Sequence, residues 1–313
     1  MARLGKTLEQ FKALRRKFET LLAAQQGKSP LRMPRPAQNP QRLRELSVFG
    51  SNPGNLRMRL YVPRALPASP GLVVALHGCT QTADDYDLGS GWSSLADRLG
   101  FVVVYPQQQP ANNPKTCFSW FLPNDIARDC GEALSIRQMI ERAIADFGVD
   151  RARVFVTGLS SGGAMASVML ATYPEVFAAG AIIAGLAYGS AASLEDAFVA
   201  MFTEQPRPAR ALGDRVRAAS RHRGPWPKIS VWHGTADAIV TPANADNILK
   251  QWIDVHGLEA RAAREETIAG HRRRVWTDAG GEALIEAIFI GGMAHGVPIA
   301  WQSGTPRGGV PGP

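Results

Sequence analysis

The chain has 313 residues and a net charge of +8, from 35 Lys and Arg against 27 Asp and Glu. Apolar residues make up 45% of the sequence and charged residues 20%, which excludes a wholly disordered or fibrous chain. The positive residues cluster at 15–17, 207–223 and 272–274, but no nucleic-acid motif accompanies them. We therefore expect a solvated basic surface and no nucleic-acid partner.

The first segment, residues 1–26, predicts an amphipathic basic helix. Its apolar residues recur at helical spacing, namely Leu4, Leu8, Phe11, Phe18 and Leu22. Such a helix packs on its own domain or a partner subunit, which we favour, or makes peripheral contact with a lipid or polymer surface. The sequence has no recognisable secretory signal and no transmembrane segment, which predicts a cytoplasmic protein. Residues 27–44, rich in Pro and Gln, are expected to form a linker.

From residue 56 onward, short apolar runs alternate with helical stretches. The runs are LRMRLYV, LVVALHG, FVVVYP, RVFVTG, AGAIIAG, ISVWHG and EAIFIGG. Several are apolar almost throughout, as strands buried on both faces of a parallel sheet must be. The pattern predicts an α/β domain over residues 45–302, with a mostly parallel, doubly wound sheet and helices on both faces. Strand-like pieces around DAGGE predict a hairpin before the last core strand, and residues 303–313 form a Gly/Pro-rich tail.

The segment GLSSG at residues 158–162 directly follows the strand RVFVTG and precedes a run of small residues typical of a helix start. It matches the G-x-S-x-G pattern, in which a sharp strand-to-helix turn lifts a serine out of the sheet and needs glycine where a side chain would clash. The bare pattern is common by chance. Its position between a strand and a helix makes Ser160 the candidate nucleophile; the alternative is a tight turn with a capping serine.

A serine hydroxyl is a poor nucleophile near neutral pH, so it needs a base and the base needs an orienting carboxylate. In α/β-hydrolases the carboxylate and then the base follow the serine along the chain. Asp237 lies in the loop after ISVWHG, and His295 lies in a glycine-flanked loop after EAIFIGG. We expect Asp237 to orient His295; the alternatives are a helix cap and a surface loop residue. The weaker candidates are Asp278 as the acid, and as the base His222, His233, His256 and His271.

Acyl transfer also requires backbone N–H groups directed at the oxyanion. We expect one from Ser161, the residue after the nucleophile, and one from Cys79 in the loop after LVVALHG. His77 in the same loop is expected to be structural. No group of His, Cys, Asp and Glu has metal-ligand spacing, and no glycine-rich nucleotide motif is present, so the predicted mechanism needs no cofactor and no metal.

Two further features concern the surroundings of the site. Trp120 and Phe121, after FVVVYP, form an apolar acyl-binding wall or else pack beneath a long loop. A helix over residues 194–216, interrupted by two prolines, is placed to act as a partial lid. Three cysteines are too few for a disulfide framework, but a bridge between Cys117 and Cys130 is open if the protein meets an oxidising compartment.

Several long motifs resemble, in order, those of the poly(3-hydroxybutyrate) depolymerase family of esterases, to which feruloyl and acetylxylan esterases are related. They are LHGCTQTADDYD, GWSSLADRLGF, CFSWFLPNDIARDCGEALSIRQMI, VFVTGLSSGGAMASVMLATYPEVFAAGAIIAGL, WHGTADAIVTPANAD and GGMAHG. The resemblance spans about residues 45–298. It implies the α/β-hydrolase fold, the triad Ser160, Asp237 and His295, and an oxyanion segment at residues 77–79. Because the family includes secreted members, an extracellular location is the alternative to a cytoplasmic one.

The sequence thus predicts a serine carboxylic ester hydrolase that forms an acyl-enzyme on Ser160 and acts on short hydroxyalkanoate esters or poly(3-hydroxybutyrate). A feruloyl or acetylxylan esterase is the alternative within the same class. A non-catalytic granule-binding protein, using residues 1–26 as its contact, is the alternative of another class. The filled triad positions disfavour it. The oligomeric state is left open.

Overall fold

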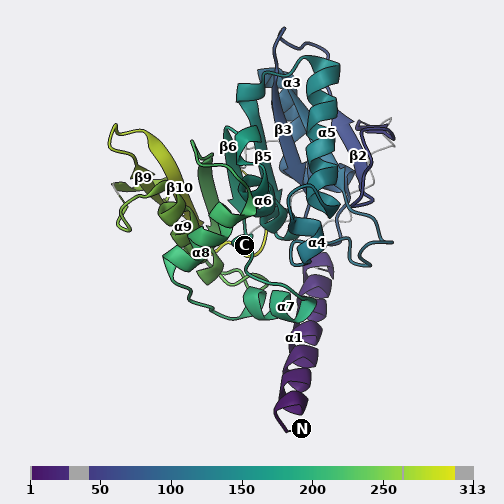
Figure 1. Ribbon diagram of the computed structural model, residues 1–313. Coiled ribbons are helices and arrows are strands. Elements are labelled where there is room, and N and C mark those ends of the chain that lie inside the picture. The colour runs from purple at the N-terminus through teal and green to yellow at the C-terminus, as the bar shows by residue number, and fades with distance from the viewer. Residues whose placement is uncertain (1, 28–41, 263, 300–313) are drawn as a thin grey trace.

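The computed structural model describes residues 2–27, 42–262 and 264–299, in which ten strands form one sheet (Figure 1). The strand order is β1-β2-β4-β3-β5-β6-β7-β10-β9-β8. The strands are β1 (Arg44–Leu46), β2 (Arg57–Tyr61), β3 (Gly71–Leu76), β4 (Phe101–Gln107), β5 (Val154–Leu159), β6 (Ala179–Ile183), β7 (Lys228–Gly234), β8 (Arg264–Ile268), β9 (His271–Thr277) and β10 (Ala283–Ile290).

The six central strands, from β4 to β10 in the sheet order, run parallel, and antiparallel strands flank them on both sides. Every residue of β3 is buried, which explains why that strand is apolar throughout. Because parallel strands all end at one edge, the loops after β3, β5, β7 and β10 meet there. This edge is where a site is expected in an open α/β sheet.

Helices cover both faces of the sheet. One face packs against α5 (Gly131–Phe147), α6 (Ser161–Thr172) and α9 (Ala243–His256), and α8 (Ala209–Ala219) packs on α6 and α9; these helices bury the larger apolar core. The other face packs against α2 (Ala83–Ser90) and α3 (Trp92–Leu99), over β3 and β4. The short α4 spans Pro123–Ile126. The two cores use alternate residues of β3, as the two-residue period of a strand requires.

Two helices lie outside the sheet layers. The N-terminal helix α1 (Ala2–Gly27) extends from the body and packs against α7 (Leu194–Phe202), as Figure 1 shows. Ser193 caps α7 by accepting a hydrogen bond from the Asp196 N–H. None of the described helices combines the length and apolar character needed to cross a bilayer.

The seven predicted runs correspond to β2, β3, β4, β5, β6, β7 and β10. DAGGE is the turn between β9 and β10, and a further hairpin joins β8 to β9. The prolines divide the helix predicted over residues 194–216 into α7 and α8. Leu43 is buried and Arg44 begins β1, so the end of the predicted linker joins the sheet. Most of that linker and all of the predicted tail, residues 303–313, lie outside the described residues, and the domain division stays a prediction.

Candidate active site

The candidate nucleophile lies on a strained turn between β5 and α6. Ser160 has φ 58° and ψ −117°, a conformation that costs a non-glycine residue about 1–3 kcal/mol. Its backbone N–H donates to the carbonyl oxygen of Ile183 at the end of β6, with N and O 2.9 Å apart. The neighbouring strand thus holds the turn, and the serine occupies the carboxyl edge of the sheet.

Glycine is required on both sides of this serine. A Cβ atom at Gly158 would overlap the carbonyl group of Gly162, and one at Gly162 would overlap the carbonyl oxygens of Leu76 and His77. The elbow therefore packs directly on the backbone that leaves β3. This close approach is what the G-x-S-x-G pattern predicts.

The loops after β7 and β10 are joined by hydrogen bonds between their backbones. The N–H of Thr235 donates to the carbonyl oxygen of Ile290, and the N–H of Ala236 donates to that of Met293, each over 3.0 Å. A Cβ atom at Gly234 would overlap the Met293 carbonyl, so the two loops approach closely only because that position is glycine. They bring together side chains that are 58 residues apart in the sequence.

Those side chains are Asp237 and His295, which the sequence predicts as acid and base. The Nδ1 atom of His295 lies 2.7 Å from Oδ2 of Asp237. The other carboxylate oxygen, Oδ1, accepts hydrogen bonds from the backbone N–H groups of Ile239 and Val240, each at 2.9 Å. Burial of Asp237 favours a raised pKa, but the positive charge available on His295 and the hydrogen bonds of His233 and His295 outweigh it, and the pKa lies well below its usual value. The carboxylate is accordingly charged at neutral pH.

A second histidine reaches the same carboxylate. The Nε2 atom of His233 lies 3.3 Å from Oδ2 of Asp237 and 2.9 Å from the carbonyl oxygen of Val240. Since a carbonyl oxygen only accepts, Nε2 must carry the proton. The sequence places His233 only among the weaker candidate bases. The structure instead places it behind the acid, fully buried in β7.

The predicted oxyanion donors, Cys79 and Ser161, both line the same cavity as Ser160. Within the described part of the chain, neither backbone N–H donates a hydrogen bond, so both are available to an oxyanion. Cys79 forms a disulfide with Cys117, whereas Cys130 is an exposed free thiol. The possible disulfide between Cys117 and Cys130 that the sequence left open is therefore wrong. The loops that follow the adjacent strands β3 and β4 meet, which brings Cys117 of the second loop next to Cys79 of the first.

His77 is structural, as expected from the sequence. Its Nδ1 lies 2.8 Å from the carbonyl oxygen of Gly78, and its Nε2 accepts from the N–H of Gln108 at 3.1 Å. Burial lowers the pKa of His77 to about 4, so the ring is neutral. Both ring nitrogens are occupied by backbone groups. This excludes the ring as a second base.

The cavity at Ser160 has a volume of about 40 Å³. Trp120 and Phe121, the predicted acyl wall, line it, with their ring centroids 5.4 Å apart in an edge-to-face arrangement. The lining also includes residues of α7, which belong to the segment predicted as a partial lid, and Phe18 of α1, which the sequence did not connect with the site. Phe18 and Leu22 of α1 are buried against the body. Contact of residues 1–26 with a lipid or polymer surface stays a prediction.

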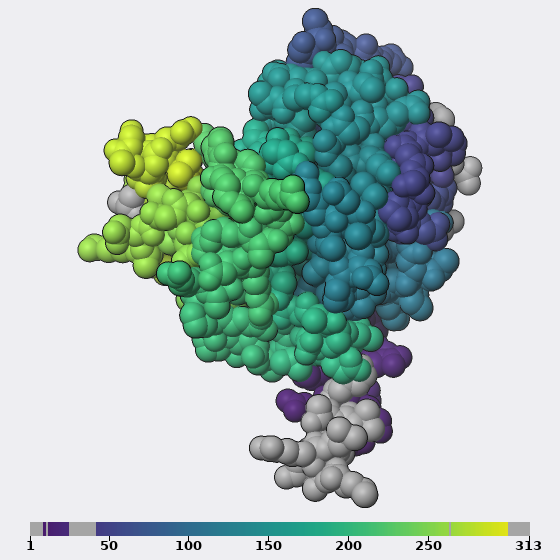
Figure 2. All heavy atoms as spheres, in the orientation of Figure 1, coloured from purple at the N-terminus to yellow at the C-terminus, as the bar shows by residue number. Residues whose placement is uncertain are grey.

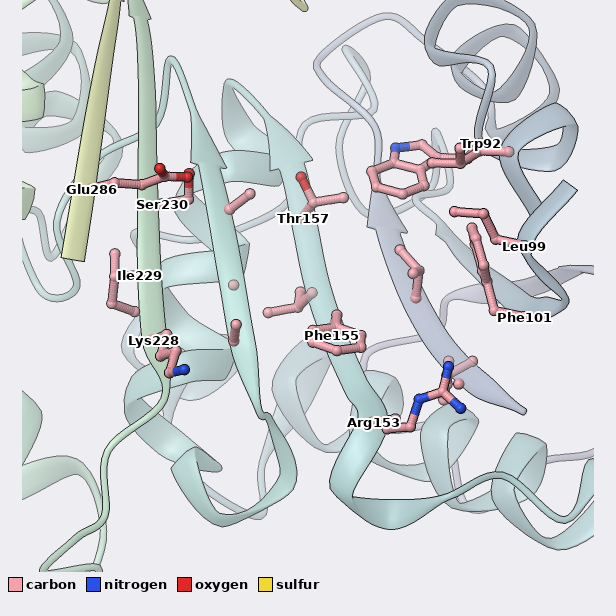
Figure 3. Close-up of a pocket in the computed structure, with 18 of the residues that line it drawn as sticks. Trp92, Leu99, Phe101, Arg153, Phe155, Thr157, Lys228, Ile229, Ser230 and Glu286 are labelled. Carbon is pink, nitrogen blue, oxygen red and sulfur yellow. The ribbon is translucent and has the colours of Figure 1, made fainter. Parts of the chain in front are cut away.

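A larger hollow of about 460 Å³ lies elsewhere, on the sheet face beside α3 (Figure 3). Phe101, Phe155 and Lys228, near the beginnings of β4, β5 and β7, line it together with Trp92 and others. It thus lies towards the edge where the parallel strands begin. None of the candidate catalytic side chains lines it, so its size does not make it the site.

A serine on a turn after one parallel strand, followed along the chain by an acid and a histidine after two later strands, is the arrangement of the α/β-hydrolases. The fold class predicted from the sequence is thereby confirmed. The chain belongs to the esterase PHB depolymerase family, whose model matches residues 56–275.

Three relatives illustrate the similarity. Poly(3-hydroxyalkanoate) depolymerase C of Paucimonas lemoignei is 46% identical over 271 residues, which cover 86% of this chain but only 65% of the relative. An acetylxylan esterase of Coprinopsis cinerea is 36% identical over 274 residues, covering 84% of this chain and 70% of the relative. The solved acetyl xylan esterase of Aspergillus awamori superposes with a TM-score of 0.76 at 30% identity, covering 82% of this chain and 95% of that one. The predicted class, an ester hydrolase of this family, is confirmed.

Proposed function

We propose that the protein hydrolyses carboxylic esters through an acyl-enzyme on Ser160, with His295 as general base and Asp237 as the residue that orients it. The observation that carries this proposal is the 2.7 Å contact between His295 Nδ1 and Asp237 Oδ2, at the same sheet edge as the strained turn of Ser160. A histidine that donates from Nδ1 to a carboxylate presents the lone pair of its Nε2 atom as the acceptor of the serine proton.

In the proposed reaction, Oγ of Ser160 attacks the ester carbonyl while His295 takes its proton. The N–H groups of Cys79 and Ser161 stabilise the negative charge that develops on the carbonyl oxygen. The protonated His295 then donates its proton to the leaving alcohol, which leaves the acyl group on Ser160. His295 then takes a proton from a water molecule that attacks the acyl carbon, and it returns this proton to Oγ of Ser160 as the acid leaves.

We further propose short hydroxyalkanoate esters, or a polyester built from them, as the substrate class. The similarity to a poly(3-hydroxyalkanoate) depolymerase supports this class, and the small apolar cavity beside Ser160 supports a short acyl group over a bulky feruloyl group. Acetylated xylan is the second candidate, because the acetyl xylan esterase of Aspergillus awamori superposes over most of the chain.

The test of the serine is Ser160→Ala compared with Ser161→Ala. With a short-chain 4-nitrophenyl ester, the first variant should lose both the burst of nitrophenol and turnover. The second should keep them, because only the backbone N–H of Ser161 is assigned a role. Full turnover in Ser160→Ala would overturn the proposal.

The acid is tested in the same way by Asp237→Asn and Asp278→Asn. Loss of the orienting carboxylate should lower kcat by about 10³–10⁴-fold, as in other triads. The Asp278 carboxylate accepts a hydrogen bond from the backbone N–H of Glu282 in the turn between β9 and β10, so its variant should keep wild-type kcat. Hydroxybutyrate oligomers, acetylated xylan and feruloyl esters, assayed side by side, then separate the substrate classes.

The Cys79–Cys117 disulfide also bears on the compartment. Disulfides persist in oxidising compartments and are rare in the cytosol, so we propose an oxidising location in place of the cytoplasmic one expected from the sequence. Protein isolated from its native host without reductant should contain one reactive thiol, that of Cys130. Three reactive thiols would contradict this location.

A further inference from the structure

The N-terminal helix supplies part of the candidate acyl pocket. Phe18 of α1 lines the cavity that contains Ser160 and the oxyanion donors, although Phe18 and Ser160 are far apart in the sequence. Figures 1 and 2 show α1 against α7, at the lower end of the body. The helix lies outside residues 56–275, which match the family model. Its contribution to the pocket is therefore a feature of this chain beyond the family match.

The position of Phe18 is fixed by aromatic packing on α7. Its ring centroid lies 5.3 Å from that of Phe198 and 6.4 Å from that of Phe202, both in edge-to-face geometry. The ammonium group of Lys17 lies 4.9 Å from the centroid of Phe202 and adds a cation–π contact. Phe18 is only 7% exposed, so the ring fills the space between α7 and the site and does not face solvent.

The cavity that remains is small. Its volume of about 40 Å³ holds only a few water molecules, since one water needs about 10–15 Å³, whereas ligand pockets usually measure about 300–1,000 Å³. The walls from Cys79 and Trp120 belong to loops that the disulfide ties together. The wall from Phe18 comes from a helix that packs on the outside of the body. Phe18 is thus a wall residue whose size can change without altering those loops.

We propose that Phe18 of the N-terminal helix closes the acyl-binding pocket beside Ser160 and limits the length of acyl chain that the site accepts. This inference rests on the proposed function of Ser160. Removing the ring extends the apolar cavity towards α7, where Phe198 and Met201 continue its lining. Longer acyl groups then bury additional methylene groups in the transition state, which favours their hydrolysis over that of acetyl esters.

The matched control is Leu22, one turn further along α1. Leu22 is 8% exposed and packs in the same core, but it does not line the cavity. Leu22→Ala therefore weakens the attachment of α1 much as Phe18→Ala does, without removing a pocket wall. Phe18→Trp is the opposite change, because the larger indole further fills the pocket.

The experiment uses the full chain and measures kcat/KM for 4-nitrophenyl acetate, butyrate, hexanoate and octanoate. In Phe18→Ala the ratio of octanoate to acetate should rise by about tenfold or more, whereas in Leu22→Ala it should stay at the wild-type value. In Phe18→Trp the ratio should fall. An unchanged ratio in both Phe18 variants, or an equal rise in Leu22→Ala, would overturn the inference.

Failure of the proposed function gives a different result. The Ser160→Ala change, combined with Phe18→Ala, should abolish turnover of every ester in the series. If turnover persists in that double variant, the proposed role of Ser160 fails together with the pocket assignment. If turnover is lost but Phe18→Ala alone leaves the acyl ratio unchanged, only the role of Phe18 is overturned.

Discussion

The Nε2 atom of His233 lies 3.3 Å from Oδ2 of Asp237, the oxygen that also contacts Nδ1 of His295. His233 is 1% exposed, and its Nδ1 atom is buried without a hydrogen-bond partner among the described residues. A buried imidazole with one unsatisfied nitrogen costs free energy, so its place next to the carboxylate calls for a compensating role. We expect that role to be holding Asp237 ionised and oriented towards His295.

Replacing this histidine should lower kcat and leave KM nearly unchanged, because His233 does not line the cavity. His233→Phe removes the second side-chain donor to a charged group, for which a loss of about tenfold is expected. His233→Gln retains an N–H group and should recover most of the rate. The low-field NMR resonance of the His295 Nδ1 proton should weaken or shift in the Phe variant and return in the Gln variant.

The matched control for this prediction is His222→Phe. The Nε2 atom of His222 also contacts a backbone carbonyl, that of Pro225 at 2.8 Å, and its ring packs on Trp226. Its variant should keep the wild-type kcat and the same low-field resonance. A wild-type kcat in His233→Phe would show that the contact with Asp237 has no part in turnover.

The Cys79–Cys117 disulfide should stabilise the fold as well as the oxyanion loop. It links positions 38 residues apart, for which loop-closure entropy predicts about 4 kcal/mol of unfolding free energy. The double variant Cys79→Ser, Cys117→Ser should therefore lose up to this amount of unfolding free energy and unfold at a lower denaturant concentration. Its kcat should also fall, because the residue at position 79 and its N–H are less firmly held. Chemical denaturation followed by tryptophan fluorescence measures the first effect.

The control is Cys130→Ser, which removes the exposed thiol and should change neither the denaturation midpoint nor kcat. Reductant should destabilise the wild-type protein and leave the double variant unaffected. Equal midpoints for wild type and double variant, measured without reductant, would contradict the stabilising role.

The candidate triad was predictable because each residue follows an apolar strand, and parallel strands bring their carboxyl ends to one edge. The cysteine pairing was not, because it depends on β4 lying beside β3, which no local pattern specifies. His233 lies inside the apolar run of β7, so the sequence predicts burial. Its contact with Asp237 arises only because the next turn folds back to Val240.

Phe18 illustrates a further limit of the sequence. Helical spacing predicts α1, because that spacing is a local property, and Phe18 and Leu22 of the predicted apolar face are buried in the core. It does not predict which surface the face covers, because packing between distant segments is set by the whole fold. Neither the helix nor the segment that follows it carries a motif that points to Ser160.

Glu132, at the start of α5, should make stability depend on pH near neutrality. Its carboxyl group is buried, and burial raises its pKa to about 7, with a contribution from the charge of Asp125. Hydrogen bonds from the Gln108 side chain at 2.6 Å and the Ser119 N–H at 2.9 Å favour the charged form but do not outweigh burial. The folded protein therefore retains a proton on Glu132 that the unfolded chain has lost.

The sign of the effect follows from this difference in proton binding. The contribution of Glu132 to stability is full below the unfolded pKa of 4.5 and is lost as the pH rises towards 7. The slope is at most about 1.4 kcal/mol per pH unit. Thermal unfolding between pH 5 and pH 8 should show Tm falling less steeply in Glu132→Gln than in wild type, because glutamine does not ionise.

Glu141, on the same helix, provides the control. A hydrogen bond from Arg151 is the main cause that lowers its pKa to about 2, so its contribution is lost only as the pH falls below about 4.5. Glu141→Gln should therefore leave the slope between pH 5 and pH 8 unchanged, even where it lowers Tm. The same slope in Glu132→Gln and wild type would show that Glu132 is already ionised in the folded protein, and that its contacts with Gln108 and Ser119 stabilise the charge.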